Sequence, residues 1–356
     1  MKIFLAGNRG YLGSVLERQL LRDGHEVIGL DTGFFDAAVG AAAGTAPPRP
    51  RKDVRRVTPE DLAGCDAVVN LAALCNDACG ELSVAATHQI NAEASVHLAR
   101  QAKALGIRSY VLASSCSVYG AARDGELTEE DAVAPETAYA ASKVRAEHEV
   151  LRLADGTFTP VALRFATLFG DSPSFRSDLM VNRIALTAGR WGEIRMNGEG
   201  LLWRPLLHVR DAARAVRRVL AATGDRPAGT GTADLAGEIF NVGFADQNHR
   251  IVDVVEMARA LLPGVTVTRT PAQDNRSYAV RFDKFHTAFT GFRSTAGAAD
   301  GLREVVDAYR QRLRRPLSEA GDGWAGTDRR EWLLARRAAG DLDADFHWNA
   351  HASVVA

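Results

Sequence analysis

Tyr139 and Lys143 stand four residues apart at the start of a helical segment of the sequence. They form the pattern YxxxK in YAASK, and the helix-like stretch VRAEHEVLRLA follows. On a helix, residues i and i+4 share a face, so the phenol and the ammonium group can reach one bound molecule. Ser115 lies 24 residues before the tyrosine. These three residues are candidates for moving a proton at a bound substrate.

The segment SSCSVYG, residues 114–120, places three small hydroxyls directly after the apolar run 109–113, which we interpret as a buried strand. A strand needs no row of hydroxyls at its tip, whereas active sites often lie at the carboxyl edge of a parallel sheet. Ser114, Ser115 and Ser117 are therefore candidate site residues. Cys116 has no histidine nearby in the sequence, so we interpret it as a small space-filling residue.

A glycine-rich turn follows the first strand-like run of the chain. Residues 2–6 lead directly into Gly7, Gly10 and Gly13, which have the spacing GxxGxxG, and a helical pattern follows. Glycines at such a turn permit a tight bend, close approach of the backbone to a pyrophosphate, and close packing of helix on strand. The strand before and the helix after favour a dinucleotide-binding turn. The turn residues expected at the cofactor are Gly7, Gly10, Tyr11 and Leu12.

Asp31 ends the second strand-like run, 18 residues after Gly13. An acidic residue at this place binds the ribose hydroxyls of adenosine. Its carboxylate would repel the 2′-phosphate of NADP, and Thr32 and Gly33 supply no arginine to receive that phosphate. The sequence therefore favours NAD over NADP as the cofactor. The alternative is that Asp31 is only a turn or capping residue.

Strand-like and helix-like segments alternate over the first two thirds of the chain. The alternation predicts an α/β fold with a Rossmann-type, doubly wound parallel sheet. Strands are predicted at 2–6, 26–30, 67–71, 109–113, 160–164 and 238–242. Helices are predicted at 12–23, 84–105, 138–154, 209–221, 251–262, 299–313 and 328–339. Residues 37–50, rich in Ala, Gly and Pro, predict a surface loop.

The composition excludes several classes of protein. The 356 residues carry a formal net charge of −1, which gives no reason to expect a nucleic acid or an anionic membrane as a partner. No apolar run is long enough to span a bilayer, and the first residues have no signal-peptide layout. The spacing of Cys75 and Cys79, without a second pair, does not fit a zinc site. We therefore expect a cytoplasmic protein with reduced thiols and no metal.

Taken together, these motifs resemble the extended short-chain dehydrogenase/reductase family, in its nucleotide-sugar epimerase and dehydratase branch. The resemblance covers residues 1 to about 315. Besides the glycine turn, Ser115 and YxxxK, it rests on further motifs in the same order: NLAA at 70–73, Asn91, VYG at 118–120, LRFAT at 163–167 and WRPLLHVRD at 203–211.

The resemblance implies a role for each catalytic motif. Tyr139 is the general base that takes a sugar hydroxyl proton while a hydride passes to the nicotinamide. Lys143 binds the nicotinamide ribose and lowers the pKa of the phenol, because a nearby cation favours phenolate. Ser115 hydrogen-bonds the reacting oxygen. Other residues expected at the cofactor are Asp53, Val54, Leu71, Ala72, Ala73, Ser114, Phe165 and Ala166.

The resemblance also implies positions for the diphosphate of a nucleotide-sugar substrate. Thr167 and Asn182 match positions that usually hold it, and Arg204 matches an arginine that clamps phosphate with its planar guanidinium. Arg276, in DNRSY, is the candidate for a second clamp. In so arginine-rich a chain, either arginine could instead be a solvated surface charge. Further substrate candidates are Asn76, which could instead cap its loop, and Ser117.

The same resemblance suggests how the chain is divided. We expect residues 1–170 to form the NAD(P)-binding Rossmann domain, to which residues 206–250 return. Residues 171–205 and 251–315 are expected to form a smaller substrate-binding lobe, and 316–356 a C-terminal extension. A homodimer built from the helices at 84–105 and 138–154 is also implied, because the family commonly pairs two such helices.

The expected activity is an NAD-dependent epimerisation of a nucleotide sugar, most simply at C4, through a transient keto-sugar. In the family's 4,6-dehydratases, an Asp–Glu pair follows the hydroxyl residue and serves the elimination of water. Cys116 and Ser117 occupy those places here, and neither group is a ready base for a carbon-bound proton. The alternatives are an NAD(P)H-dependent ketoreductase or a decarboxylating relative, and a non-catalytic dinucleotide-binding module.

Overall fold

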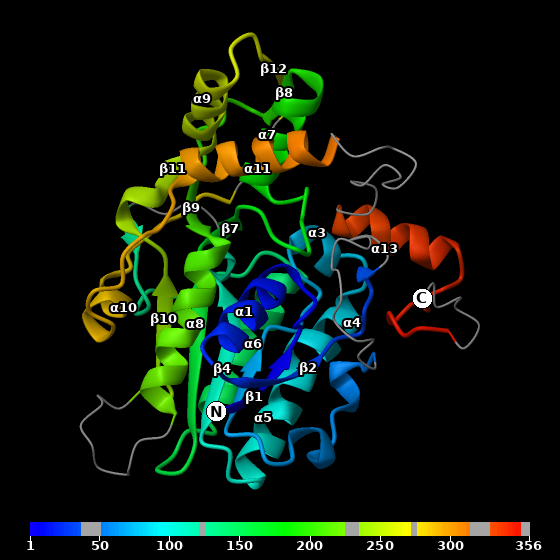
Figure 1. The fold of residues 1–356 in the computed structure, drawn as a ribbon, viewed down its shortest axis with the longest axis vertical. Coiled ribbons are helices and arrows are strands. Elements are labelled where there is room, and N and C mark those ends of the chain that lie inside the picture. The colour runs from blue at the N-terminus through cyan, green and yellow to red at the C-terminus, as the bar shows by residue number, and fades with distance from the viewer. Residues whose placement is uncertain (37–50, 121–124, 225–234, 272–275, 314–327, 350–356) are drawn as a thin grey trace.

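The computed structural model describes residues 1–36, 51–120, 125–224, 235–271, 276–313 and 328–349 (Figure 1). The loop expected at 37–50 lies outside these residues. Within the described ranges, no helix combines the length and apolar character that crossing a bilayer requires.

A parallel sheet of six strands, in the order β10-β6-β4-β3-β1-β2, forms the centre of the larger domain. Its strands are apolar because helices cover both faces. All six lie where the sequence predicted them, which confirms the Rossmann-type α/β fold. Their bounds are β1 (Lys2–Ala6), β2 (Glu26–Leu30), β3 (Ala67–Asn70), β4 (Ser109–Ser115), β6 (Thr159–Phe165) and β10 (Ile239–Val242).

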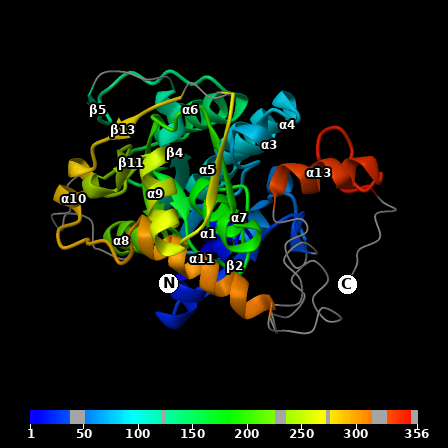
Figure 2. The ribbon, with the colours of Figure 1, turned by 90° about the horizontal axis from the view of Figure 1, so that it is seen from above.

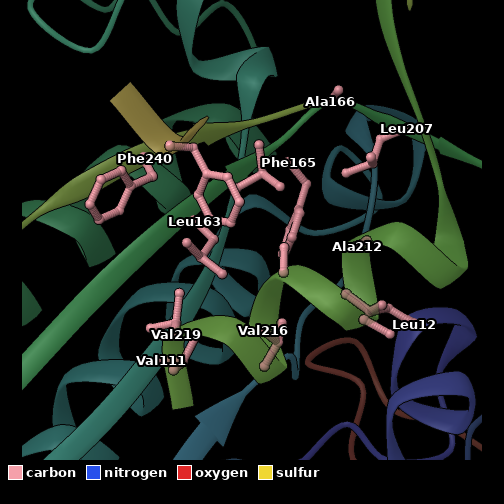
Figure 3. Packing of buried hydrophobic residues seen from close by; sticks show 14 of the residues in the cluster. Leu12, Val111, Leu163, Phe165, Ala166, Leu207, Ala212, Val216, Val219 and Phe240 are labelled. Atoms are coloured by element: carbon pink, nitrogen blue, oxygen red, sulfur yellow. The ribbon is translucent and has the colours of Figure 1, made fainter. Parts of the chain in front are cut away.

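Two helices, α1 (Tyr11–Arg22) and α8 (Val209–Thr223), cover one face of the sheet. Successive strand residues point to opposite faces, so Ile3 and Leu5 pack on this side and Phe4 on the other. Figure 3 shows α8 side chains lying against strand residues of the sheet. The packing holds the amino-terminal end of α1 directly at the end of β1.

The opposite face is covered by α5 (Ala94–Ala104) and α6 (Ala138–Leu151). The helix predicted at 84–105 is interrupted: α4 (Val84–His88) and α5 are joined by one π-helical turn, Gln89–Glu93. Such turns often occur at functional sites. Here the turn carries Asn91, whose amide bonds both backbone groups of Leu74, at 2.8 and 3.2 Å, and the Ser142 hydroxyl at 3.0 Å. Asn91 therefore fixes the loop that follows β3.

The smaller lobe lies above the carboxyl ends of the strands (top of Figure 1). A separate apolar cluster holds it together, with Phe169, Ile184, Val254 and Val305 among its members. Its main elements are α7 (Met180–Trp191), β8 (Glu193–Asn197), α9 (Ile251–Leu261), β12 (Thr266–Thr270) and α11 (Ala298–Leu313).

Short strands connect the lobe to the main sheet. The connecting strands are β7 (Thr167–Phe169), β9 (Trp203–His208) and β11 (Asn248–Arg250), and a second pair is β5 (Glu126–Leu127) with β13 (Ala279–Val280). After β13, α10 (Asp283–Ala288) packs on β10, with Phe282 and Phe285 in the sheet's own core. This part of the chain differs from the expectation that all of 251–315 belongs to the smaller lobe. These aromatic side chains instead bury against the edge strand of the sheet.

The C-terminal part comprises α13 (Arg329–Ala338) and the residues up to 349. Both views place α13 (red) beside α3 (Asp77–Gly80), away from the smaller lobe's helices (Figures 1 and 2). Leu333, Leu342 and Phe346 join the apolar cluster that packs under β2 and β3. This segment is therefore an integral part of the larger domain.

Candidate active site

A cleft of about 1660 Å³ opens between the carboxyl edge of the sheet and the smaller lobe. The strands β2 and β3 lie on opposite sides of β1, so the chain changes its direction across the sheet at β1. In doubly wound folds, ligands bind at such a switch point. Residues that directly follow β1 and β3, together with residues of β2, β4 and β6, line the floor of the cleft, and residues of α7, β8 and α9 line the opposite wall.

The glycine turn at the end of β1 has the geometry of a phosphate cradle. Gly7 has a φ of 82°, and a Cβ there would lie 2.9 Å from the Ala72 backbone nitrogen. A Cβ on Gly13 would lie only 1.9 Å from the Gly7 carbonyl oxygen. The first turn of α1 has no side-chain cap and no acidic residue, so its N–H groups can receive an anion. The residues present therefore fit the pyrophosphate of a dinucleotide.

Asp31 follows β2 and lies at one end of the cleft. Its carboxylate accepts hydrogen bonds from the backbone N–H groups of Arg9, at 3.2 Å, and Gly33, at 2.8 Å. Burial raises the pKa of this carboxyl, and the two N–H groups oppose the shift. Arg9 and Arg51 both pair with Asp36, at 2.5 and 3.1 Å. Nothing in the sequence pattern had pointed to these two guanidinium groups.

Asp53 and Val54 lie at the same end of the cleft, where the adenine was expected. Asp53 caps a short helical turn by accepting the Arg55 backbone N–H at 2.8 Å, and it also pairs with the Arg55 guanidinium at 2.6 Å. Val54 is buried and offers an apolar surface. Neutralisation of Asp53 by Arg55 makes this wall suitable for an uncharged heterocycle.

Tyr139, Lys143 and Ser115 meet in the cleft, as the sequence predicted. The Lys143 ammonium donates a 2.9 Å hydrogen bond to the Ala113 carbonyl oxygen and lies 5.8 Å from the centre of the Tyr139 ring. Burial raises the pKa of the Tyr139 phenol, whereas the Ser115 side chain acts in the opposite direction. Burial lowers the pKa of Lys143. The arrangement suits a phenol that gives and takes a proton beside a cation.

A buried ion pair stands behind this group. Glu147 on α6 and Arg164 on β6 bond through two contacts, of 2.9 and 2.7 Å, with side chains 3% and 5% exposed. Ser114 donates to the same glutamate at 2.5 Å, and Arg164 also bonds the Tyr119 hydroxyl at 3.1 Å. The Ser114 hydroxyl is therefore engaged with Glu147, although the residue lines the cleft as expected.

Cys116 and Ser117 differ in what they present to the cleft. Cys116 is 1% exposed, does not line the cleft, and donates its thiol to the Arg164 carbonyl oxygen at 3.3 Å. Burial raises the pKa of this thiol, so it stays protonated at neutral pH. Ser117 lines the cleft with a buried hydroxyl oxygen that has no hydrogen-bond partner. Ser117 thus differs from Cys116 in lining the cleft, although its hydroxyl oxygen is itself covered.

On the substrate side, two expected residues are held by carboxylates. Asn76, with a φ of 70°, donates to Asp178 at 2.5 Å, and its amide oxygen caps α3. Arg276 forms an ion pair with Asp77. Asn76 therefore caps its loop, which was the alternative interpretation of this residue, and it also lines the cleft. The ion pair joins the far side of the cleft to the loop after β3.

Arg204 lines the cleft but is strongly fixed by its surroundings. Its guanidinium donates to the carbonyl oxygens of Trp203, at 2.8 Å, and Arg276, and lies over the Tyr278 ring, 5.4 Å from its centre. Thr167, the other expected diphosphate residue, also lines the cleft. Both residues therefore lie on the wall expected for the substrate, with the Arg204 guanidinium held by backbone carbonyl oxygens.

Asn182 has a different position from the one we expected. It is fully buried and does not line the cleft. Its amide accepts the Gly170 N–H at 2.9 Å and donates to the Tyr11 hydroxyl, at 3.2 Å, and the Arg176 carbonyl oxygen, at 3.0 Å. Because these bonds use both amide hydrogens, Asn182 braces the cofactor turn from behind instead of holding a diphosphate.

Two buried arginines, Arg176 and Arg329, line the cleft without having been expected from the sequence. Arg176 is buried and pairs with Asp178, at 2.5 Å, and its charge lowers the pKa of Tyr139. Arg329 comes from the C-terminal segment. Neither lies in a motif, and arginine is too common in this chain for composition to single them out.

All other expected site residues line the cleft. At the cofactor end these are Gly7, Gly10, Tyr11, Leu12, Leu71, Ala72, Ala73, Phe165 and Ala166. The Tyr11 hydroxyl donates to the Gly170 carbonyl oxygen at 2.6 Å, so its ring, not its hydroxyl, is left for the cofactor.

The fold and the cleft are those of a dinucleotide-dependent enzyme with a Tyr–Lys–Ser site. A family model, the NAD dependent epimerase/dehydratase family, matches residues 3–243. The chain belongs to this family of extended short-chain dehydrogenase/reductase enzymes, as the sequence motifs indicated. It is thus an NAD-dependent enzyme of the nucleotide-sugar epimerase and dehydratase type.

Proteins similar to this chain include both dehydratases and epimerases by name. A dTDP-glucose 4,6-dehydratase of Streptomyces niveus is 28% identical over 87% of this chain and 93% of its own. A probable UDP-glucuronate 4-epimerase of Rhizobium meliloti is 25% identical over 88% of this chain and 98% of its own. Among solved structures, MoeE5 with UDP-glucuronic acid and NAD has a TM-score of 0.73 at 25% identity, and the alignment covers 87% of this chain and 99% of MoeE5.

Proposed function

We propose that the protein epimerises a nucleotide-diphosphate sugar, at C4, through a transient keto-sugar and without loss of water. One observation carries the choice between epimerase and dehydratase. The two positions after Ser115 hold a thiol turned into the core and a serine that lines the cleft with its hydroxyl oxygen buried. Neither is a base for the C5 proton, so elimination has no acid and base there.

Residues of this chain would carry out the proton steps. NAD, when bound, would accept a hydride from the sugar and return it to the opposite face. Tyr139 takes the proton from the sugar hydroxyl and gives it back after the sugar has turned, and Ser115 hydrogen-bonds the same oxygen. Lys143, held by Ala113, keeps a cation beside the phenol and so favours phenolate.

The substrate would lie along the wall formed by the smaller lobe. Arg204 and Thr167, which line this wall, would contact the diphosphate, and Ser117 would contact a sugar hydroxyl after a small shift of its side chain. Relatives named for UDP- and dTDP-sugars support this class of substrate. The cofactor would be NAD, because Asp31 stands where a 2′-phosphate would lie and Asp36 already engages Arg9 and Arg51.

The product's mass and stereochemistry test this proposal. Purified protein is incubated with UDP-glucose, UDP-glucuronic acid and dTDP-glucose, and products are examined by mass spectrometry and proton NMR. We expect a product of unchanged mass and inverted C4 configuration from one of them. A product lighter by one water would refute the epimerase and establish a dehydratase. A product heavier by two hydrogens, with NAD(P)H consumed, would establish a reductase instead.

We also propose a homodimer through α4, α5 and α6. Support comes from Val84, which is 51% exposed at the start of α4, although Arg145 gives α6 a charged outer face through its pairs with Glu93 and Glu149. Light scattering at micromolar concentration should give twice the chain mass. A monomer would refute the dimer, and loss of dimer in Val84→Glu would locate it.

A further inference from the structure

The C-terminal segment places a buried arginine in the cofactor end of the cleft. Arg329, the first residue of α13, is 4% exposed and lines the cleft. Its Nη2 atom donates to the hydroxyl of Ser174 at 2.6 Å and to its carbonyl oxygen at 3.3 Å, and the guanidinium lies over the Phe35 ring, 3.9 Å from its centre. The side chain is thus held in one place by neutral groups.

The charge of Arg329 is felt by the carboxylates of Asp178 and Asp31, but neither pairs with it directly. Among the residues that the structure describes, Arg329 forms no ion pair, and its buried Nη1 atom has no hydrogen-bond partner. Burial and the neighbouring Arg176 lower its pKa to about 10, so it is still a cation at neutral pH. A buried, unpaired charge is costly, and an anion in the cleft would remove that cost.

The surroundings of Arg329 identify which anion. Ser174 bonds through its backbone N–H to the Ser172 hydroxyl, at 3.2 Å, and Ser172 bonds the Tyr11 carbonyl oxygen, at 2.7 Å. Tyr11 is the first residue of α1, whose N–H groups form the phosphate cradle. Phe35, on the other side of the guanidinium, lies four residues beyond Asp31. Arg329 therefore stands between the cradle and the ribose end, where a dinucleotide has its pyrophosphate.

The rest of the segment is fastened along the adenosine side of the same cleft. The indole N–H groups of Trp332 and Trp348 donate to the carbonyl oxygens of Phe34, at 2.6 Å, and Thr32, at 2.8 Å. Arg55, the partner of Asp53, also donates to the carbonyl oxygens of Asp345, at 2.8 Å, and Phe346, at 3.2 Å. Residues 328–349, which we call the C-terminal strap, thus bond to both loops expected at the adenosine.

We propose that Arg329 binds the pyrophosphate of NAD and that the C-terminal strap retains the cofactor through turnover. A guanidinium offers paired N–H donors that match phosphate oxygens, and a preordered strap loses little entropy when NAD binds. Retention rests on the proposed function, because an epimerase returns its hydride and needs no cofactor exchange. The contact between Arg329 and the pyrophosphate does not depend on it.

Binding measurements on the full chain test the contact without any substrate turnover. Arg329→Met removes the charge and keeps the apolar bulk, and Arg310→Met is the matched control, since Arg310 is 58% exposed on α11. Calorimetry on cofactor-stripped protein measures affinity for NAD, ADP-ribose, adenosine and UDP. Arg329→Met should weaken NAD and ADP-ribose by about 10- to 100-fold, leaving adenosine and UDP as in wild type. The fraction of purified protein that carries NAD should fall as well.

Each other outcome would overturn the proposal. Unchanged NAD affinity would remove Arg329 from the cofactor site, and a loss confined to UDP would assign it to the substrate's diphosphate. Equal losses for adenosine and ADP-ribose would show a structural role. The melting temperatures of the ligand-free proteins show whether each variant is folded. Arg329→Met should melt at a temperature no lower than that of wild type, because the substitution removes a buried charge that has no ion-pair partner. If it does not fold, Arg329→Lys, which keeps the charge but not the fork, serves for the same comparison.

Discussion

The Nζ atom of Lys143 lies 2.9 Å from the Ala113 carbonyl oxygen and donates a hydrogen bond to it. This bond joins α6 to the end of β4, two residues before Ser115. Tyr139 is one helical turn before Lys143, so the same bond sets the phenol against the serine. The proposed catalytic group is therefore positioned by a strand end and a helix.

Replacing Tyr139 by Phe should abolish turnover and preserve the cofactor site. The substitution removes the proton acceptor but keeps the ring that fills the cleft. We expect turnover to fall by about 10²- to 10⁴-fold, with NAD affinity close to that of wild type. Product formation and NAD titration check the two expectations separately. Wild-type turnover in this variant would exclude Tyr139 as the base.

The pH profile should depend on Lys143. The phenolate is the active base, so activity rises with pH through the pKa of Tyr139, which burial raises. A cation beside the phenol stabilises phenolate, and Lys143→Met removes it, so the rising limb should move to higher pH. The kcat is measured with NAD and substrate saturating, and an unmoved limb in the variant would contradict this coupling.

Adding one methyl group at Gly13 should damage the cofactor turn. A Cβ there would lie 1.9 Å from the Gly7 carbonyl oxygen, so the turn and α1 must move apart. We expect Gly13→Ala to lose about 1 to 3 kcal/mol of stability and most of its affinity for NAD. Gly156→Ala is the control, since a Cβ there meets nothing within 4 Å. Thermal melting and NAD titration measure the stability and the NAD affinity of both variants. The same values for Gly13→Ala and Gly156→Ala would contradict the close packing at Gly13.

Asp31 should determine the choice between NAD and NADP. Asp31→Ser with Thr32→Arg removes the carboxylate that repels a 2′-phosphate and adds a guanidinium for it. The ratio of the two dissociation constants should shift toward NADP by about tenfold or more. Asp66→Ser is a control, because that carboxylate lies at the other end of β1 and bonds the Lys2 N–H at 2.6 Å. Tighter binding of NADP than of NAD by the wild type would refute this assignment.

The elements and the cofactor turn could be predicted from the sequence because they depend on local properties. Apolar runs bounded by turns define the six strands, and glycine spacing defines the cradle, whatever lies elsewhere in the chain. Tyr139 and Lys143 face one site because a helix repeats every 3.6 residues. Ser115 followed from its place at the end of a strand. Each of these predictions needed only neighbouring residues.

The detailed assignment of polar side chains depended on contacts between distant residues. Asn76 bonds Asp178 across 102 positions and Arg276 pairs with Asp77 across 199, and no local pattern records either pairing. Asn182 was expected at the substrate but is bonded to the back of the cofactor turn, because packing buried both of its amide hydrogens there. Burial and partners decide whether such a residue faces a ligand.

The sequence alone determined the α/β order, the glycine turn and the identity of the Tyr–Lys–Ser group, because each is a property of a short segment. Tertiary structure alone decided which of two adjacent residues lines the cleft: the turn after β4 directs the Cys116 thiol to the Arg164 carbonyl oxygen, whereas Ser117 forms part of the cleft wall. It also brought Arg329 against Ser174, 155 positions away. Only the folded chain removes that guanidinium from water and leaves its charge for a ligand to balance.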